Sequence, residues 1–222
     1  MKVIHLIPSA FNYFNDIRDK AMSLVNRERE CGIDAEAFTL QYGTVSRREV
    51  IAVAAAAPDL NFKGTVSGPA LVKELDNYDV VHLHCPFFGL AKDFIVWKKL
   101  HPDKVLVLTY WRDARISDLF SLFLAWYNAF YLPKLFVLCD AVLGLFDNDF
   151  DRLKGSKYLR DKTKFADMKM YYDDLAKNNI HLTPATDELK LKHLDMEAIA
   201  CVSFYSLLIQ KNYGERTKEK IV

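Results

Sequence analysis

The apolar positions along the first two thirds of the chain indicate strands that are buried on both faces. The apolar runs are short and continuous and do not alternate with polar residues, which is typical of a parallel sheet covered by helices on both sides. The runs expected to be strands are Lys2–Ile7, Ala35–Leu40, Val80–His84, Val105–Thr109 and Ala141–Phe146. The pattern therefore predicts a mostly parallel sheet.

Segments with helical spacing lie between these runs. Asp16–Arg29 places apolar residues on one face and precedes Gly32, a suitable residue just beyond a helix end. The further helix candidates are Pro69–Leu75, Leu90–Leu100 and Asp118–Leu132. Strands that alternate with helices predict right-handed βαβ units. We therefore expect residues 1–158 to form one doubly wound, Rossmann-like α/β domain.

The pattern changes after Leu159, where the sequence becomes richer in charged residues. Asp167–Asn178 and Asp187–Lys192 are expected to be short polar helices, and Met196–Asn212 a longer helix with an apolar stripe. Because such a stripe must be buried, residues 159–222 are predicted to be a helical extension that packs on the first domain.

Charge and glycine spacing exclude several functions. The 222 residues include 30 Lys and Arg against 29 Asp and Glu, whereas nucleic-acid-binding domains carry a clear basic excess. None of the eight glycines has the spacing of a Rossmann dinucleotide fingerprint or of a P-loop. The sequence therefore argues against nucleic acid as a partner, and we expect neither a cofactor nor a metal ion.

Cysteine usage and hydropathy bear on the cellular compartment. The four cysteines are far apart and form no CxxC pair, which argues against a zinc or redox motif and indicates reduced core thiols. The longest uncharged stretch, Leu119–Pro133, is too short to span a membrane, and the N-terminus lacks the features of a signal peptide. The expectation is a cytoplasmic protein without a transmembrane segment.

The candidate site lies in the loops that follow the strands, because ligands of open parallel sheets bind beyond the carboxyl ends of the strands. The first of these loops contains Phe11 and Asn12. It leads into a helix whose N-terminus could hold an anion. A plain helix cap at Asp16 is the alternative.

Two histidines end the third apolar run. His82 and His84 are two residues apart and face the same side of the sheet, whereas Cys85 faces the other side. A histidine pair at a strand end suits proton handling or hydrogen bonding to a hydroxylated ligand, which favours a functional role for His84 over a structural one. A zinc site is disfavoured because no further soft ligand lies nearby on that side.

Aromatic and charged residues follow the fourth run, namely Tyr110, Trp111, Arg112, Asp113 and Arg115. Rings and guanidinium groups at a strand end could stack on a ligand ring and pair with a phosphate. A local Arg–Asp surface pair is an alternative of equal weight.

The segment Asp118–Pro133 is unusually rich in aromatic residues. A helix that is apolar on all sides is expected to be buried, so we interpret this one as a crossover helix. Peripheral contact with a membrane, through the basic residues at its flanks, is the alternative.

Four segments, in this order, resemble the N-terminal domain of family 4 glycosyltransferases. They are Lys2–Ile7, Asp79–Pro86, Leu108–Asp113 and Cys139–Asp149, and the similarity covers residues 1–159. The resemblance implies half of a GT-B fold, in which an N-terminal Rossmann-like domain binds the acceptor and a C-terminal one binds a nucleotide-sugar. Members of this family transfer the sugar with retention of configuration.

The resemblance also implies roles for individual residues. His84 matches the family's strand-end histidine that contacts the transferred sugar, and Tyr110–Asp113 match an acceptor-side loop. We therefore expect His84 to be the catalytic residue and, as a polar side chain at a strand end, to lie outside the core. The cleft for a sugar or lipid-linked acceptor is expected to contain Phe11, Asn12, His82, Tyr110, Trp111, Arg112, Asp113 and Arg115.

The sequence departs from the family pattern in three places. The first loop lacks the usual Gly-Gly pair, and Tyr110-Trp111-Arg112 stands where an aromatic-His-Gly pattern is common. The residues after Leu159 are too few for a donor-binding domain of ordinary size. Glu28 and Glu36 have the spacing of the family's donor-site glutamates, but they lie between a helix and a strand, so we interpret the spacing as a coincidence.

Two functions from different classes follow. In the first, the chain is the acceptor-binding half of a glycosyltransferase. It transfers a sugar from a nucleotide-sugar only together with a donor-binding partner subunit, in the cytoplasm or at the inner face of a membrane. In the second, it is a non-catalytic binding or interaction module derived from the same fold. A flavodoxin-like nucleotide binder is a third interpretation, because fold alone does not determine function.

Overall fold

Seven strands of the described chain form one sheet in this computed structural model. The structure describes residues 1–8, 15–39, 62–65, 72–87, 90–111, 126–127, 129–144, 165–177 and 196–219. The strands are β1 (Lys2–Ile7), β2 (Asp34–Thr39), β3 (Phe62–Thr65), β4 (Val80–Cys85), β5 (Val105–Tyr110), β6 (Ala141–Gly144) and β7 (Phe165–Asp167). The helices are α1 (Asn15–Glu30), the short 3-10 helix η2 (Leu75–Asn77), α4 (Ala91–Leu100), α6 (Leu132–Leu138), α8 (Met168–Lys177) and α9 (Met196–Glu219).

The strands pair in parallel, in the spatial order β3-β2-β1-β4-β5-β6-β7. The chain first builds the sheet outward from β1 to β3 and then returns to add β4 on the other side of β1. This confirms the doubly wound, Rossmann-like α/β fold. The carboxyl ends of β1 and β4 flank the switch point at which ligands bind in such sheets.

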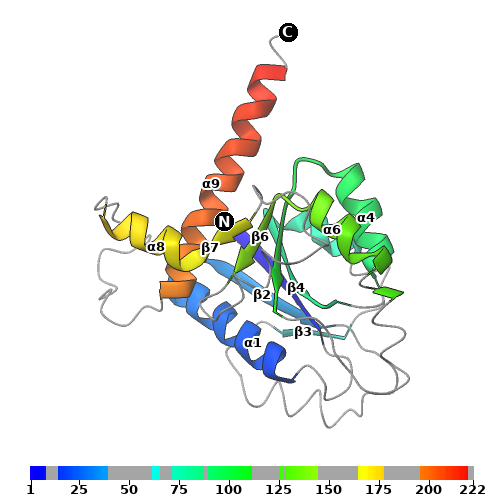
Figure 1. Cartoon of the computed structure of the whole chain (residues 1–222), viewed down its shortest axis with the longest axis horizontal. Helices are drawn as coiled ribbons and strands as arrows, with labels where there is room; N and C mark the ends of the chain where they lie inside the picture. The colour runs from blue at the N-terminus through cyan, green and yellow to red at the C-terminus, as the bar shows by residue number, and fades with distance from the viewer. Residues whose placement is uncertain are drawn as a thin grey trace.

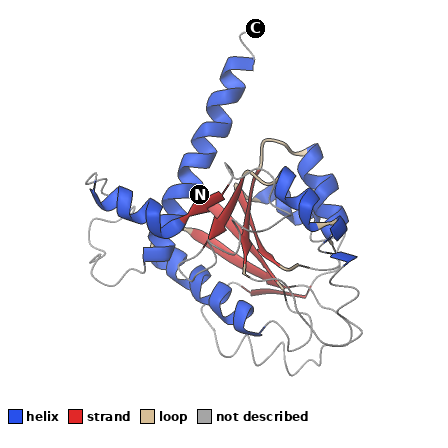
Figure 2. Ribbon diagram, in the orientation of Figure 1, coloured by secondary structure: helices blue, strands red, loops and turns tan. Residues whose placement is uncertain are grey.

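Helices cover both faces of the sheet (Figures 1 and 2). On one face, Val81, Leu83 and Cys85 of β4 share a core with apolar residues of α4 and α6. On the other face, Val80 of β4 belongs to a core that includes α1 and α9. Every residue of β4 and β5 is buried. The continuous apolar runs are therefore explained by burial on both sides.

The end of α1 has the geometry that its sequence predicts. Gly32 adopts a positive φ of 81°, a conformation that disfavours residues with a side chain. Its backbone N–H donates to the carbonyl of Arg29 at 2.9 Å, and that of Cys31 donates to Arg27 at 3.1 Å. These bonds satisfy the last carbonyls of the helix and turn the chain into β2.

The sheet continues beyond residue 158, where only helices are expected from the sequence. β7 pairs in parallel with β6, with Val142 opposite Phe165. The two strands approach closely, since a Cβ atom on Gly144 would lie only 2.6 Å from the Phe165 ring. The helical character of α8 and α9 agrees with the sequence. Cys201 and Leu208 of α9 belong to the core on the face of the sheet that α1 also covers. The last turns of α9 project away from the sheet (Figure 1).

Other expectations are met only in part or lie outside the described residues. β3 has no counterpart among the predicted strands. The described part of Pro69–Leu75 is a helical turn that continues into η2. Within the aromatic segment, Tyr127 is buried, but Trp126 and Phe130 are 46% and 55% exposed, so full burial of this helix is wrong. The expected helix Asp187–Lys192 lies outside the described residues.

Two further findings concern the cysteines and the membrane. All four cysteines are free thiols, and three of them are buried while Cys31 is half-buried. In the described part of the chain, no helix combines the length and the apolar character that a membrane span requires.

The hydrogen bonds of a buried lysine link the start of β5 to the start of β6. Lys98 is only 5% exposed, and its Nζ donates to Asp140 Oδ2 at 2.8 Å and to the carbonyls of Lys104 and Pro102 at 2.6 and 3.2 Å. The same carboxylate oxygen accepts the backbone N–H of Leu106 at 2.7 Å.

We expect Lys98→Met to lower the free energy of unfolding by about 2–3 kcal/mol, because the substitution removes a charged donor from three acceptors while keeping the length of the side chain. Urea denaturation measures the change. Lys99→Met, at the exposed neighbouring position, is the control and is expected to change stability by less than about 0.5 kcal/mol. Equal stability of the two variants would contradict the role assigned to Lys98.

Candidate functional site

Three histidines from two adjacent strands lie together on the face of the sheet that α1 and α9 cover. His5 of β1 is in register with His82 of β4, and His84 follows two residues later on the same side. The ring centroids of His82 and His84 are 4.3 Å apart, and those of His5 and His82 are 4.7 Å apart. All three side chains are completely buried.

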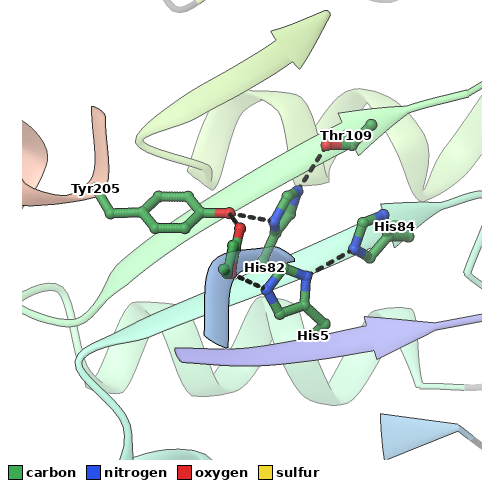
Figure 3. Close-up of polar contacts among 6 residues, drawn as sticks. His5, His82, His84, Thr109 and Tyr205 are labelled. Atoms are coloured by element: carbon green, nitrogen blue, oxygen red, sulfur yellow. Dashed lines mark hydrogen bonds and ion pairs between the residues drawn. The ribbon is translucent and has the colours of Figure 1, made fainter. Parts of the chain in front are cut away.

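Four more side chains complete what we call the histidine network, of which Figure 3 draws every member except Trp111. Its members are His5, Glu28 of α1, His82, His84, Thr109 of β5, Trp111 just after β5, and Tyr205 of α9. Elements from both ends of the chain therefore meet at the centre of the sheet.

The hydrogen bonds of the histidine network form one continuous chain. From its outer end, Trp111 Nε1 donates to His84 Nδ1 at 3.0 Å, and His84 Nε2 lies 3.0 Å from His5 Nδ1. His5 Nε2 lies 2.7 Å from one oxygen of Glu28, whose other oxygen accepts the Tyr205 hydroxyl at 3.0 Å. The Tyr205 oxygen lies 2.6 Å from His82 Nδ1, and His82 Nε2 lies 2.6 Å from the Thr109 hydroxyl oxygen.

Burial favours the uncharged forms of two histidines and of the tyrosine in the network. Desolvation, assisted by the neighbouring histidines, lowers the pKa values of His82 and His84 well below the ordinary 6.5. Desolvation also raises the pKa of Tyr205 well above 10.0, and the charge of Glu28 adds to that shift. The imidazoles of His82 and His84 and the phenol of Tyr205 are therefore neutral near pH 7.

Trp111 is the member of the network nearest the outside of the protein. The indole is half-buried, and its ring lies 5.9 Å from the His84 ring at an interplanar angle of 23°. The ammonium group of Lys20 lies 5.6 Å from the indole centroid. Trp111 directly follows β5, so this aromatic face lies at the carboxyl edge of the sheet.

The comparisons with known proteins identify no family. No protein-family model matches this chain, and no curated protein matches it. The resemblance to family 4 glycosyltransferases therefore rests on the segments quoted above and stays a prediction.

The structure brings together three of the expected site residues and separates a fourth. His82, His84 and Trp111 belong to the histidine network. Tyr110 points to the opposite face of the sheet, where its ring packs edge-on against Phe136 at 5.7 Å. The remaining candidates lie outside the described residues and are Phe11, Asn12, Arg112, Asp113 and Arg115.

The expectation that His84 lies outside the core is wrong. Its side chain is 0% exposed, and both ring nitrogens have hydrogen-bond partners. The physical reason is that helices cover this face of the sheet, up to the end of β4. His84 reaches the carboxyl edge only through Trp111.

Sequence reasoning misses His5, Glu28, Thr109 and Tyr205 as parts of a site. A usable signal exists for Glu28, which follows Leu24 by four residues and Ala21 by seven, and therefore lies on the apolar face of α1. Glu36 is bonded instead to the Tyr78 hydroxyl at 2.6 Å. The two glutamates thus make hydrogen bonds in different places, which agrees with the interpretation of their spacing as a coincidence.

The three histidines are also the candidate metal ligands of the described residues. One nitrogen from each lies within 4.8 Å of the others, and neutral imidazoles bind zinc. Two nitrogens bound to the same zinc ion are at most about 4.2 Å apart, because each Zn–N bond is about 2.1 Å long. This limit is shorter than the 4.8 Å within which the three nitrogens lie. All six ring nitrogens already have hydrogen-bond partners. The geometry therefore fits a hydrogen-bonded network better than a metal centre.

Proposed function

We propose that this chain is the acceptor-binding half of a glycosyl-transfer system and binds a sugar-containing acceptor at the carboxyl edge of its sheet. The observation that carries the proposal is the pairing of Trp111 with His84. A half-buried aromatic face lies against a hydrogen-bonding imidazole at the ends of two neighbouring central strands. Ligand sites of this kind combine aromatic walls with a few fixed polar groups, and such sheets bind ligands at this edge.

A donor-binding partner is the second part of the proposal. The described residues form one Rossmann-like sheet, whereas the enzymes that the sequence resembles bind acceptor and donor on two such domains. Transfer depends on holding both substrates in one geometry, so a partner that binds the nucleotide-sugar is needed for catalysis. The four free thiols support a cytoplasmic setting for this assembly.

A sugar-binding experiment with a tryptophan variant tests the acceptor site. The probes are the methyl glycosides of common hexoses and N-acetylhexosamines, and protein NMR shifts during titration measure their affinity. We expect Trp111→Ala to weaken binding about two- to fivefold or more, because a stacking or cation–π contact of the ring contributes about 0.5–1 kcal/mol.

The control for this experiment is Trp126→Ala, which removes an exposed indole from a different part of the chain. It is expected to bind the same glycoside as tightly as the unaltered protein. If no glycoside binds, or if both variants bind equally, the proposed acceptor site is wrong.

A non-catalytic binding module is the second candidate, and the burial of His84 favours it. Both ring nitrogens of His84 are occupied, so the described structure offers no free nitrogen for a transferred sugar. Transfer assays on the chain together with a nucleotide-sugar-binding partner separate the two candidates. Full activity of a His84→Gln complex would favour the module, whereas loss of turnover with retained partner binding would favour catalysis.

A further inference from the structure

The outer end of the histidine network fixes the direction of the first three hydrogen bonds. An indole N–H only donates, so Nδ1 of His84 must accept from Trp111. A neutral His84 then carries its proton on Nε2 and donates to Nδ1 of His5. His5 in turn carries its proton on Nε2 and donates to Glu28. These bonds form one arm of the network, from Trp111 to Glu28, in which each histidine accepts one hydrogen bond and donates one.

The carboxylate of Glu28 fixes the direction of the second arm. A carboxylate only accepts, so the single hydroxyl proton of Tyr205 is donated to Glu28. The Tyr205 oxygen then accepts from Nδ1 of His82. Nε2 of His82 is left to accept the hydroxyl proton of Thr109. The two arms therefore converge on Glu28 (Figure 3), and with the bond from Trp111 every polar side-chain atom of the network has a partner of the right kind.

The two arms differ in which residues fix the direction of their hydrogen bonds. A threonine hydroxyl both donates and accepts, so Glu28 alone sets the direction of the arm that ends at Thr109. The arm that ends at Trp111 cannot reverse without bringing two N–H groups against each other. The network therefore has one arm whose direction is fixed at both of its ends, which leads to the carboxyl edge, and one whose direction is fixed by Glu28 alone, which leads into the core.

We propose that Glu28 and His5 are positioning residues that hold Nδ1 of His84 unprotonated, as an acceptor for a ligand hydroxyl at the carboxyl edge. In the structure the indole N–H of Trp111 occupies this acceptor, so the ligand hydroxyl has to displace that bond. This inference rests on the proposed function and narrows it. At this atom the site takes a neutral donor, such as a sugar hydroxyl, and rejects phosphodiester and carboxylate oxygens, which only accept.

The tautomers of the histidines test the inference without any ligand. Nitrogen NMR of protein with isotope-labelled histidine distinguishes protonated from unprotonated ring nitrogens. At neutral pH we expect the proton on Nε2 in His5 and His84, and on Nδ1 in His82. A different tautomer at His84 would overturn the inference.

Two variants separate the contribution of Glu28 from that of Trp111. In Trp111→Phe the indole donor is lost, and we expect His84 to keep its proton on Nε2 because Glu28 still directs the arm. In Glu28→Gln we expect the proton of His82 to move to Nε2, because the amide N–H₂ group can donate to Tyr205. The tautomer of His84 is expected to stay the same, because Trp111 still donates to its Nδ1. The double variant is expected to lose the single tautomer of His84. If His84 switches in Trp111→Phe alone, or keeps one tautomer in the double variant, Glu28 does not position it.

A chelator and a fluorinated sugar complete the test. EDTA is expected to leave all the histidine signals unchanged, and a change would show that an ion, not the network, holds the rings. For any methyl glycoside that binds, replacement of the contacted hydroxyl by fluorine should weaken binding about tenfold, because fluorine cannot donate to His84. Glycosides that bind with no such loss would overturn this inference and leave the acceptor site standing. Absence of any glycoside binding would overturn the acceptor site itself, and with it the hydroxyl at His84.

Discussion

Glu28→Ala is expected to lower the free energy of unfolding by about 3–5 kcal/mol, because the substitution removes the acceptor on which both arms of the histidine network converge. Glu28 is completely buried and accepts bonds from His5 and Tyr205. Without it, two buried donors lose their partner, at a cost of about 1–3 kcal/mol each, and a cavity remains beneath α1. Urea denaturation with linear extrapolation measures the loss.

The matched control for this prediction is Glu30→Ala, two residues further along the same helix. Glu30 is exposed, so its loss is expected to change stability by less than about 0.5 kcal/mol. Similar unfolding midpoints for the two variants would show that the buried carboxylate does not support the fold.

Loss of folding stability on acidification is the second large effect that we expect from the histidine network. The folded protein holds the pKa values of His82 and His84 well below 6.5, so it binds fewer protons than the unfolded chain as the pH falls through 6.5. Stability is therefore present above that pH and is lost below it, at about 1.4 kcal/mol per pH unit for each histidine. Between about pH 7.5 and pH 5, the two residues together should cost about 4 kcal/mol.

Unfolding curves recorded across this pH range check the prediction. His84→Gln removes one of the two titrating groups, so the dependence on pH should become about half as steep, whatever the stability of the variant at neutral pH. A stability that stays flat down to pH 5, or an unchanged slope in His84→Gln, would be inconsistent with buried neutral histidines.

The sequence predicts the sheet well where the elements are long and apolar. β1, β4 and β5 begin at the expected residues and end at or within one residue of the expected position, and Gly32 ends α1 as its position suggests. β3 and β7 are missed because their sequences, FKGT and FAD, hold too few apolar residues to form a run. Short strands owe their place to the strand beside them more than to their own pattern.

The candidate site is only partly predictable for a different reason. The two-residue spacing of His82 and His84 correctly places them on one side of the sheet. Nothing local shows that Tyr205, 177 residues beyond Glu28, covers them. The burial of His84 depends on where α9 packs, and sequence periodicity tells only that α9 must pack somewhere. This is why a side chain expected at an open edge lies in the core.

The contact of Tyr205 with Glu28 and His82 sets the order in which this protein can be completed during its synthesis. The strands and α1 that carry the three histidines and Glu28 leave the ribosome long before α9 does. Until α9 emerges, Glu28 and His82 lack the partner that Tyr205 provides, and contacts this distant in sequence form slowly. The nascent chain therefore completes this buried network only after α9 has been made, when Tyr205 reaches Glu28 and His82.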